Sequence, residues 1–137
     1  VWGWGWTYGV NGNNGGNWTT PRQYTTLSNI RDINTGADFS HFIQNNDIYG
    51  VGYANYGELF IGNTTLQGPN PVKSNLTNVA GNVGMATGGY DNAWILSADG
   101  KLVWGIGFSD AAGQEFGSSL VQSTSTSSAV PWTFSDN

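Results

Sequence analysis

The residues of this sequence that could perform acid–base chemistry are nine acidic side chains and a single histidine, His41. A hydrolytic triad needs a base beside its nucleophile, and zinc sites draw on several Cys or His side chains. His41 lies inside an apolar run, and the sequence has no Cys. The sequence therefore predicts a structural role for His41 and excludes a zinc site of the usual kind.

Paired carboxylates could instead serve glycoside hydrolysis. Asp38 and Asp91, however, occupy equivalent positions of an internal repeat, which favours a turn or cap role over catalysis. No twelve-residue calcium loop with its closing Glu is present. The glycine-rich run 9–16 is followed by no Lys-Ser/Thr pair, so it predicts a turn and not a phosphate loop. We therefore predict a protein that is not an enzyme, with no metal and no cofactor.

Aromatic residues are the stronger functional candidates, because Trp and Tyr stack on sugars and dominate protein interfaces. Five of them lie in strand-like repeats and are predicted to pack in the core: Trp2, Trp4, Tyr49, Trp94 and Trp104. Four lie in loop-like context and are predicted to form a contact surface: Tyr8, Trp18, Tyr24 and Tyr56. Three end the strand-like repeats, where core and surface both remain open, and they join the candidates for partner contact: Trp6, Tyr53 and Phe108.

An internal repeat must position these residues. Residues 1–6 match 48–53 and 103–108 in the pattern apolar, aromatic, Gly, apolar, Gly, aromatic. Residues 36–43 match 89–96 between them. The period is roughly 50 residues, which falls in the range of β-propeller blades.

The elements within each repeat are predicted to be strands joined by tight turns. Asp99-Gly100 separates two apolar runs, and both residues accept the positive φ of a hairpin turn. Residues 45–47, Asn-Asn-Asp, take the same place one repeat earlier. The apolar runs are continuous, as in strands that are buried on both faces, and no helical periodicity is present. We therefore expect essentially no helix.

The fold class predicted is all-β, a partial β-propeller of antiparallel blades. Its repeat units cover approximately residues 1–35 (partial), 36–88 and 89–137, within one domain. Such a stretch cannot close a ring of four to eight blades. We expect the blades to meet neighbours from the same longer chain, which we favour because Val1 begins in mid-blade, or from copies of the chain. Residues 118–128 are expected to be a loop or linker, and residues 131–134 the start of a strand.

The sequence resembles the regulator-of-chromosome-condensation repeat family. Residues 57–62, Gly-Glu-Leu-Phe-Ile-Gly, stand where that family has Gly-Gln-Leu-Gly-x-Gly, and Trp4-Gly5 and Val51-Gly52 stand where it has Trp-Gly. Phe39 and Asn92 replace a His of the family pattern. The resemblance covers nearly the whole chain as about two and a half repeats, and it implies a seven-bladed propeller. Nucleotide exchange and chromatin binding, the activities of the founding members, are not carried over, because fold does not imply function.

The low content of charged residues and the negative net charge limit the classes of partner that the chain could bind. Charged residues make up 9% of the chain and the net charge is −5, so nucleic-acid binding, which needs clustered Lys and Arg, is not expected. No apolar run is long enough to insert into a membrane. Low charge with many small polar residues is typical of extracellular or virion-surface proteins. We predict a propeller that recognises a surface protein or glycan, as in a tail fibre or adhesin; the alternatives are an architectural subunit of a virion or filament and an intracellular interaction scaffold.

Overall fold

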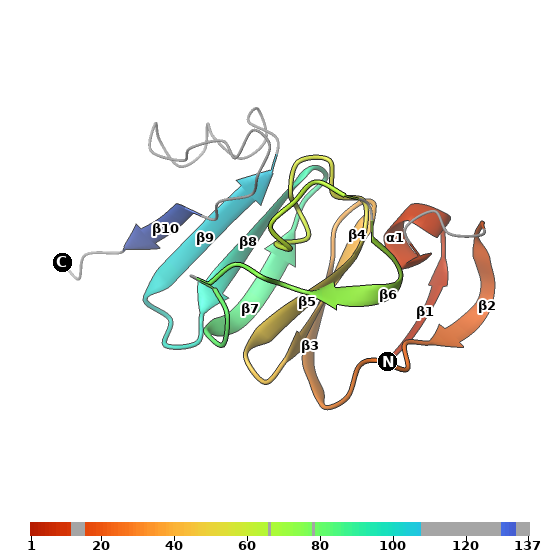
Figure 1. Cartoon of the computed structure of the whole chain (residues 1–137), viewed down its shortest axis with the longest axis horizontal. Coiled ribbons are helices and arrows are strands. Elements are labelled where there is room, and N and C mark those ends of the chain that lie inside the picture. The colour runs from red at the N-terminus through yellow and green to blue at the C-terminus, as the bar shows by residue number, and fades with distance from the viewer. Residues whose placement is uncertain (12–15, 66, 78, 108–129, 134–137) are drawn as a thin grey trace.

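Antiparallel sheets build almost all of the chain that the structure describes (Figure 1). The structure is a computed structural model, and it describes residues 1–11, 16–65, 67–77 and 79–107 and the backbone of residues 130–133. The elements are β1 (Trp2–Gly5), α1 (Thr7–Asn11), β2 (Trp18–Gln23), β3 (Ile30–Thr35), β4 (Phe39–Gln44), β5 (Asp47–Gly52), β6 (Gln67–Lys73), β7 (Val83–Gly88), β8 (Asn92–Ser97), β9 (Leu102–Gly107) and β10 (Val130–Thr133).

The sheets are consecutive blades. β3–β4–β5–β6 and β7–β8–β9–β10 are four-stranded and run in sequence order, whereas β1–β2 is two-stranded. The repeat makes β1 equivalent to β5 and β9, so β1–β2 is one half of a blade. The predicted fold, a partial β-propeller, is therefore confirmed.

The hairpin turns follow the sequence prediction. Asn45 and Asn46, with φ of 51° and 64°, form the whole turn between β4 and β5. Gly100, with φ of 75°, lies in the turn between β8 and β9. Asn and Gly are the residues that enter this left-handed region at least cost. The strand expected near the C-terminus is present as β10, which pairs with β9.

The short helix α1 was not predicted. Its single turn overlaps the run for which the sequence indicated only a turn, and tertiary hydrogen bonds hold it in place. The Tyr24 hydroxyl donates to the carbonyl oxygen of Val10 at 2.7 Å, and the Ser40 hydroxyl donates to that of Gly9 at 2.9 Å. These bonds come from distant strands, and the local pattern therefore did not reveal the helix.

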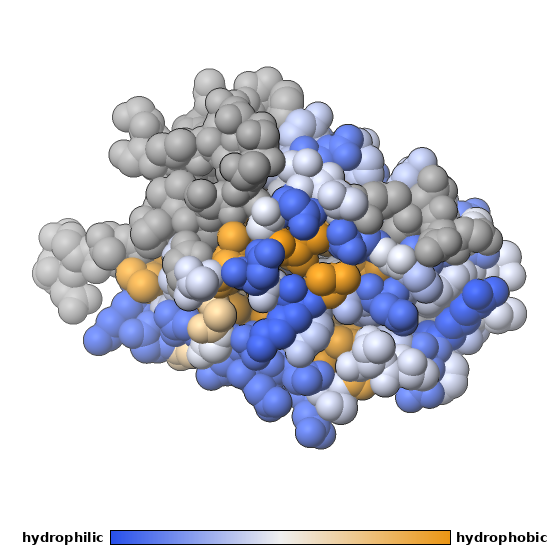
Figure 2. All heavy atoms as spheres, in the orientation of Figure 1, coloured by the Kyte–Doolittle hydropathy of each residue, from blue (hydrophilic) through white to orange (hydrophobic). Residues whose placement is uncertain are grey.

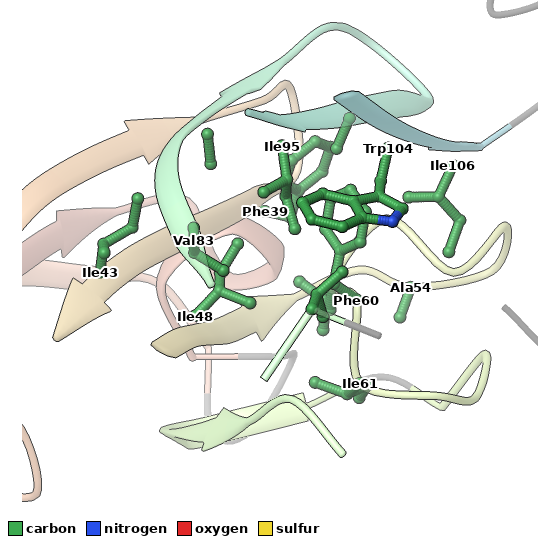
Figure 3. Packing of buried hydrophobic residues seen from close by; sticks show 14 residues of the cluster. Phe39, Ile43, Ile48, Ala54, Phe60, Ile61, Val83, Ile95, Trp104 and Ile106 are labelled. Atoms are coloured by element: carbon green, nitrogen blue, oxygen red, sulfur yellow. The ribbon is translucent and has the colours of Figure 1, made fainter. Parts of the chain in front are cut away.

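The main core lies between the two complete blades (Figure 3). Phe39 of β4 and Trp104 of β9 are each 1% exposed and pack with Ile95 of β8. Fully burying an apolar side chain of this size contributes about 1.5–3 kcal/mol. The prediction that Trp104 belongs to the core is confirmed.

The connection between β5 and β6 belongs to this core as well. Leu59, Phe60 and Ile61 are all at most 2% exposed, and they pack among side chains of both blades. Phe60 has a φ of 56°, and its amide donates to the carbonyl oxygen of Gly57 at 2.9 Å. This Gly-bounded run is therefore a plug of the blade interface.

A smaller core joins the half-blade to the next blade. Trp18 and Tyr24 are 6% and 2% exposed and pack with Phe42 of β4. The ring centroids of Trp18 and Tyr24 lie 5.6 Å apart. The sequence predicts that both rings form a contact surface, and the structure corrects this: Trp18 in β2 and Tyr24 just after it point inward and fill the gap between the half-blade and the next blade.

Two predicted core residues are exposed. Trp2 and Trp4 are 59% and 61% exposed, although the equivalent Trp104 and Ile106 of β9 are 1% and 2% exposed. The physical reason is that Trp104 and Ile106 pack against the preceding blade, whereas β1–β2 is the first sheet of the described residues and no described blade precedes it. The other two, Tyr49 and Trp94, are partly buried.

Gly5 and Gly52 occupy equivalent positions of the repeat, but only Gly52 lies close to the backbone of neighbouring elements. Gly52 and Gly5 share positive φ values of 114° and 121°. A Cβ on Gly52 would meet the carbonyl oxygens of Asp38 and Tyr8 at 2.5 and 2.6 Å, whereas a Cβ on Gly5 meets nothing within 4 Å. We expect Gly5→Ala to cost about 1 kcal/mol from backbone strain alone and Gly52→Ala about 3 kcal/mol or more, because the backbone must also move. Urea unfolding measures both, and equal losses would contradict this account.

Candidate functional site: an aromatic and acidic surface at the loop end

The two ends of the blades differ in construction. The tight hairpins β4–β5 and β8–β9 lie at one end, which we call the hairpin end. The β3–β4 and β7–β8 turns, α1 and the long β5–β6 connection lie at the other, which we call the loop end (Figure 1). Equivalent strands point the same way, so β1 and β5 both finish at the loop end. Residues just beyond Gly5 and Gly52 must therefore gather there.

Aromatic rings form a row at this end. The centroids of Trp6 and Tyr8 are 5.1 Å apart with the rings edge to face, and those of Tyr8 and Tyr53 are 6.1 Å apart in the same geometry. Trp6 is 56% exposed, and both tyrosines are partly exposed. The backbone fixes the row, because the Tyr53 amide donates to the carbonyl oxygen of Asp38 at 2.8 Å. Rings held this way present apolar faces at low entropic cost.

Two acidic side chains come from equivalent turns beside this row. The Ala37 amide donates to the carbonyl oxygen of Gly89 at 3.1 Å and ties the β3–β4 turn to the β7–β8 turn. Asp38 and Asp91 follow those residues in the two turns. The pKa of Asp91 is raised, first by partial burial and then by the negative charge of Asp38. The two carboxylates are thus close enough to repel each other.

Charge is unevenly shared between the two ends. The basic side chains of the described residues all belong to the hairpin half of the strands: Arg22, Arg31, Lys73 and Lys101. Lys73 forms an ion pair there with Asp47 at 2.7 Å. The loop end holds Asp38, Glu58 and Asp91 with no cation among the described residues. The carboxylates at the loop end are therefore not neutralised by described side chains.

Glu58 is the buried member of this acidic group. Its side chain is 0% exposed; Oε2 accepts a hydrogen bond from the Tyr56 amide at 2.9 Å, and Oε1 has no hydrogen-bond partner among the described residues. Burial, with a smaller contribution from the negative charge of Asp91, raises its pKa to about 7. Its carbonyl oxygen accepts from Nε2 of His41 at 2.7 Å. His41 is itself fully buried, and desolvation lowers its pKa to about 4.

The structure brings together four of the seven residues predicted to contact a partner: Trp6, Tyr8, Tyr53 and Tyr56. Trp18 and Tyr24 lie in the smaller core, and Phe108 falls outside the described residues. Sequence reasoning missed the acidic part of the surface, because it assigned Asp38 and Asp91 only to turns. The repeat itself could have revealed this, because it places Asp38 and Asp91 at the same end of the blades as Trp6 and Tyr53, which follow β1 and β5.

Among the described residues, no helix is both long enough and apolar enough to cross a membrane. No group of three or more His, Cys, Asp or Glu side chains in the described ranges is arranged to hold a metal ion.

The repeat, the four-stranded sheets and the buried β5–β6 plug define a stretch of consecutive β-propeller blades. Solved structures show the same fold. Human WBSCR16 matches with a TM-score of 0.70 and 22% identity, over 94% of this chain and 33% of that one. Yeast RCC1 (Prp20), solved with Kap60 bound, matches with a TM-score of 0.62 and 22% identity, over 80% of this chain and 28% of that one. The chain thus spans a third or less of those chains.

Comparison of the sequence with family models gave no match, and comparison with curated proteins gave none either. At 22% identity the structural likeness shows the fold alone. The candidate site therefore has to be interpreted from its own residues.

Glu58 and His41 make opposite contributions to the pH dependence of stability. The pKa of Glu58 is raised from 4.5 to about 7 in the fold; its contribution is therefore fully present below about pH 4.5 and is lost as the pH rises through 7. The pKa of His41 is lowered from 6.5 to about 4, so its contribution is present above pH 6.5 and is lost as the pH falls through 4.

Glu58→Gln isolates the first contribution, because an amide oxygen can still accept from Tyr56. We expect the free energy of unfolding of Glu58→Gln, relative to the original chain, to rise on the order of 3 kcal/mol between pH 4.5 and 7.5. Urea unfolding across this pH range measures the difference. A difference that stays constant with pH would contradict the burial of an ionisable Glu58.

Proposed function

We propose that this chain is a non-catalytic β-propeller module that binds a partner protein through its loop end. The observation that carries the proposal is the row Trp6, Tyr8 and Tyr53, three rings in contact at the loop end. Tyr8 is held by α1, and Trp6 and Tyr53 directly follow β1 and β5. Aromatic anchors of this kind dominate binding energy at protein interfaces. Loops on a rigid scaffold are also where binding surfaces usually lie.

A binding role agrees with the chemistry of the site. His41 is sealed in the core with a low pKa, and Glu58 is 0% exposed, so neither presents a proton to a substrate. RCC1 (Prp20) was solved bound to the protein Kap60, which shows that a protein containing this fold can take a protein partner. A glycan is the other ligand that exposed Trp and Tyr rings could stack against.

We further propose that the partner lies on a virion or cell surface and that the module is extracellular. The support is compositional: charged residues are only 9% of the chain, and Gly, Asn, Ser and Thr are abundant. Antibody labelling of intact particles or cells that carry the parent protein tests the location. Labelling that requires permeabilisation would instead favour the intracellular scaffold.

A photo-crosslinking amino acid placed at Tyr56 tests the binding role in the full-length parent. We expect a discrete protein adduct, and we expect Trp6→Ser with Tyr53→Ser to reduce it about tenfold or more, as for interface anchors. The same crosslinker at Asn45, an exposed turn residue of the hairpin end, is the control. Two results would show that the partner does not bind at the loop end. One is an adduct that forms at Asn45 but not at Tyr56, and the other is an adduct whose yield the ring substitutions leave unchanged. Binding to a glycan array with the same dependence on the rings would establish the glycan alternative.

An architectural role is the second candidate, and the free side of β1 favours it. Trp2 and Trp4, with Tyr24, Ile33 and Phe42, line an apolar cavity of about 190 Å³ between the half-blade and β3. Ile33 is 52% exposed, whereas Ala86, its equivalent in β7, is 5% exposed against the preceding blade. The two strands that would complete the half-blade, from the same chain or from a copy, would bury this surface.

Sedimentation of the isolated chain tests the architectural role. If copies join through β1, the chain self-associates, and Trp4→Ser weakens the association about tenfold, because the loss of a buried aromatic contact is worth roughly 1.4 kcal/mol or more. Tyr90→Ser removes an aromatic ring that is 73% exposed elsewhere and should change nothing. A chain that remains monomeric at high concentration would argue against joining by copies.

A further inference from the structure

The acidic pair at the loop end repeats from blade to blade. Gly36-Ala37-Asp38 and Gly89-Tyr90-Asp91 are equivalent turns, and the hydrogen bond from Ala37 to Gly89 holds them side by side. Asp38 and Asp91 are both partly exposed. Each of the two complete blades therefore places one carboxylate at the loop end.

The structure places no described cation near this pair. Two carboxylates that repel each other are costly to keep without a counter-charge. The chain does pair charges elsewhere, as Lys73 with Asp47 shows. Its four basic side chains nevertheless all lie in the hairpin half of the blades. The loop end is thus complementary in charge to a basic partner.

Glu58 supplies an independent indication of a missing donor. Its side chain is fully buried, and Oε1 has no hydrogen-bond partner among the described residues. The negative charge of Asp91 helps to raise the pKa of Glu58, and Glu58 helps to raise the pKa of the Tyr53 hydroxyl. A buried acceptor left without a partner is destabilising. An added positive charge near Asp91 would stabilise the ionised form of Glu58.

The ring of Tyr53 adds a second kind of group that attracts a cation. The Tyr53 ring packs edge to face with that of Tyr8, and its amide is hydrogen-bonded to the carbonyl oxygen of Asp38. The pKa of the Tyr53 hydroxyl is raised by partial burial and then by Tyr56 and the neighbouring acids. A ring face attracts a cation within about 6 Å, and carboxylates beside it add to the attraction. We propose that the loop end binds a basic segment of a partner protein, with a lysine or arginine side chain seated between Asp38, Asp91 and the ring of Tyr53.

This inference rests on the proposed function and narrows its partner to one that carries basic side chains. A segment with several spaced cations suits carboxylates that recur from blade to blade. A small metal ion suits them less, because no three-ligand group is present among the described residues. The same negative charge excludes nucleic acid.

Peptide titration tests the proposal on the full chain. The probe is a ten-residue peptide of alternating Gly and Lys, and backbone amide NMR shifts at about 20 mM salt report its binding. We expect shifts confined to the loop end around Asp38, Tyr53 and Asp91, and an affinity that falls severalfold at 150 mM salt as screening grows. Alternating Gly-Glu and Gly-Ser peptides should not bind.

Matched variants separate the contributions of charge and ring. Asp38→Asn with Asp91→Asn should weaken binding about tenfold, whereas Asp32→Asn, which removes the same charge at the hairpin end, should change it less than twofold. Tyr53→Phe keeps the ring face and should bind as the original chain does. Tyr53→Leu should bind about threefold more weakly, since an exposed cation–π contact is modest.

Several results would overturn the proposal. These are equal binding of the Gly-Glu or Gly-Ser peptide, shifts centred on the hairpin end, or an affinity that the Asp38 and Asp91 changes leave untouched. Intact NMR spectra of each variant establish that it is folded. Failure here would remain distinct from failure of the proposed function: a crosslinked partner at Tyr56 without peptide binding would keep the loop end as an interface and reject only its preference for cations.

Discussion

The packing of one blade face against the next is the constraint on which the rest of this structure depends. Strands such as β4 and β8 carry apolar residues on both faces, so neither face can be left to water. Phe39 and Trp104 fill the gap between the complete blades, with Phe60 inserted from the β5–β6 connection. Close packing of this kind requires backbone contact at the ends of the strands, and the positive φ of Gly52 and Gly107 supplies it.

Because the blades repeat, equivalent residues can be compared, and a residue that lacks a neighbouring blade has a larger exposed fraction. Equivalent positions of β1, β5 and β9 differ in exposure according to whether a blade lies beside them, and no difference in sequence chemistry is needed to explain it. Trp4 is exposed where Val51 and Ile106 are buried. The free side of β1 is therefore a consequence of missing neighbours. It says more about assembly than about ligand recognition.

The same repetition creates the loop end. The equivalent strands β1 and β5 point the same way, so the aromatic residues that follow them lie at the same end of the blades. The β3–β4 and β7–β8 turns, which hold Asp38 and Asp91, lie at that end as well. The surface inherits the rigidity of the blades through backbone hydrogen bonds such as that from Tyr53 to Asp38. Its aromatic and acidic character, with the basic residues held at the opposite end, gives a scaffold with two chemically different ends. Because the two ends differ in charge and in aromatic content, a partner that recognises the loop end binds in a defined orientation.

The sequence by itself determined the blades, their period and their hairpins, because these depend on local turn chemistry and on short apolar runs. It also determined that Trp6, Tyr8, Tyr53 and Tyr56 were candidates for contact, since strand ends and loops can be located from the repeat. Only the tertiary structure decided which rings face water. Trp18 and Tyr24 are buried, and Trp2 and Trp4 exposed, because burial depends on the neighbouring blade and not on the residue's own segment. The helix α1 and the meeting of Asp38 with Asp91 were likewise decided by contacts between residues far apart in the chain, which a local pattern does not encode.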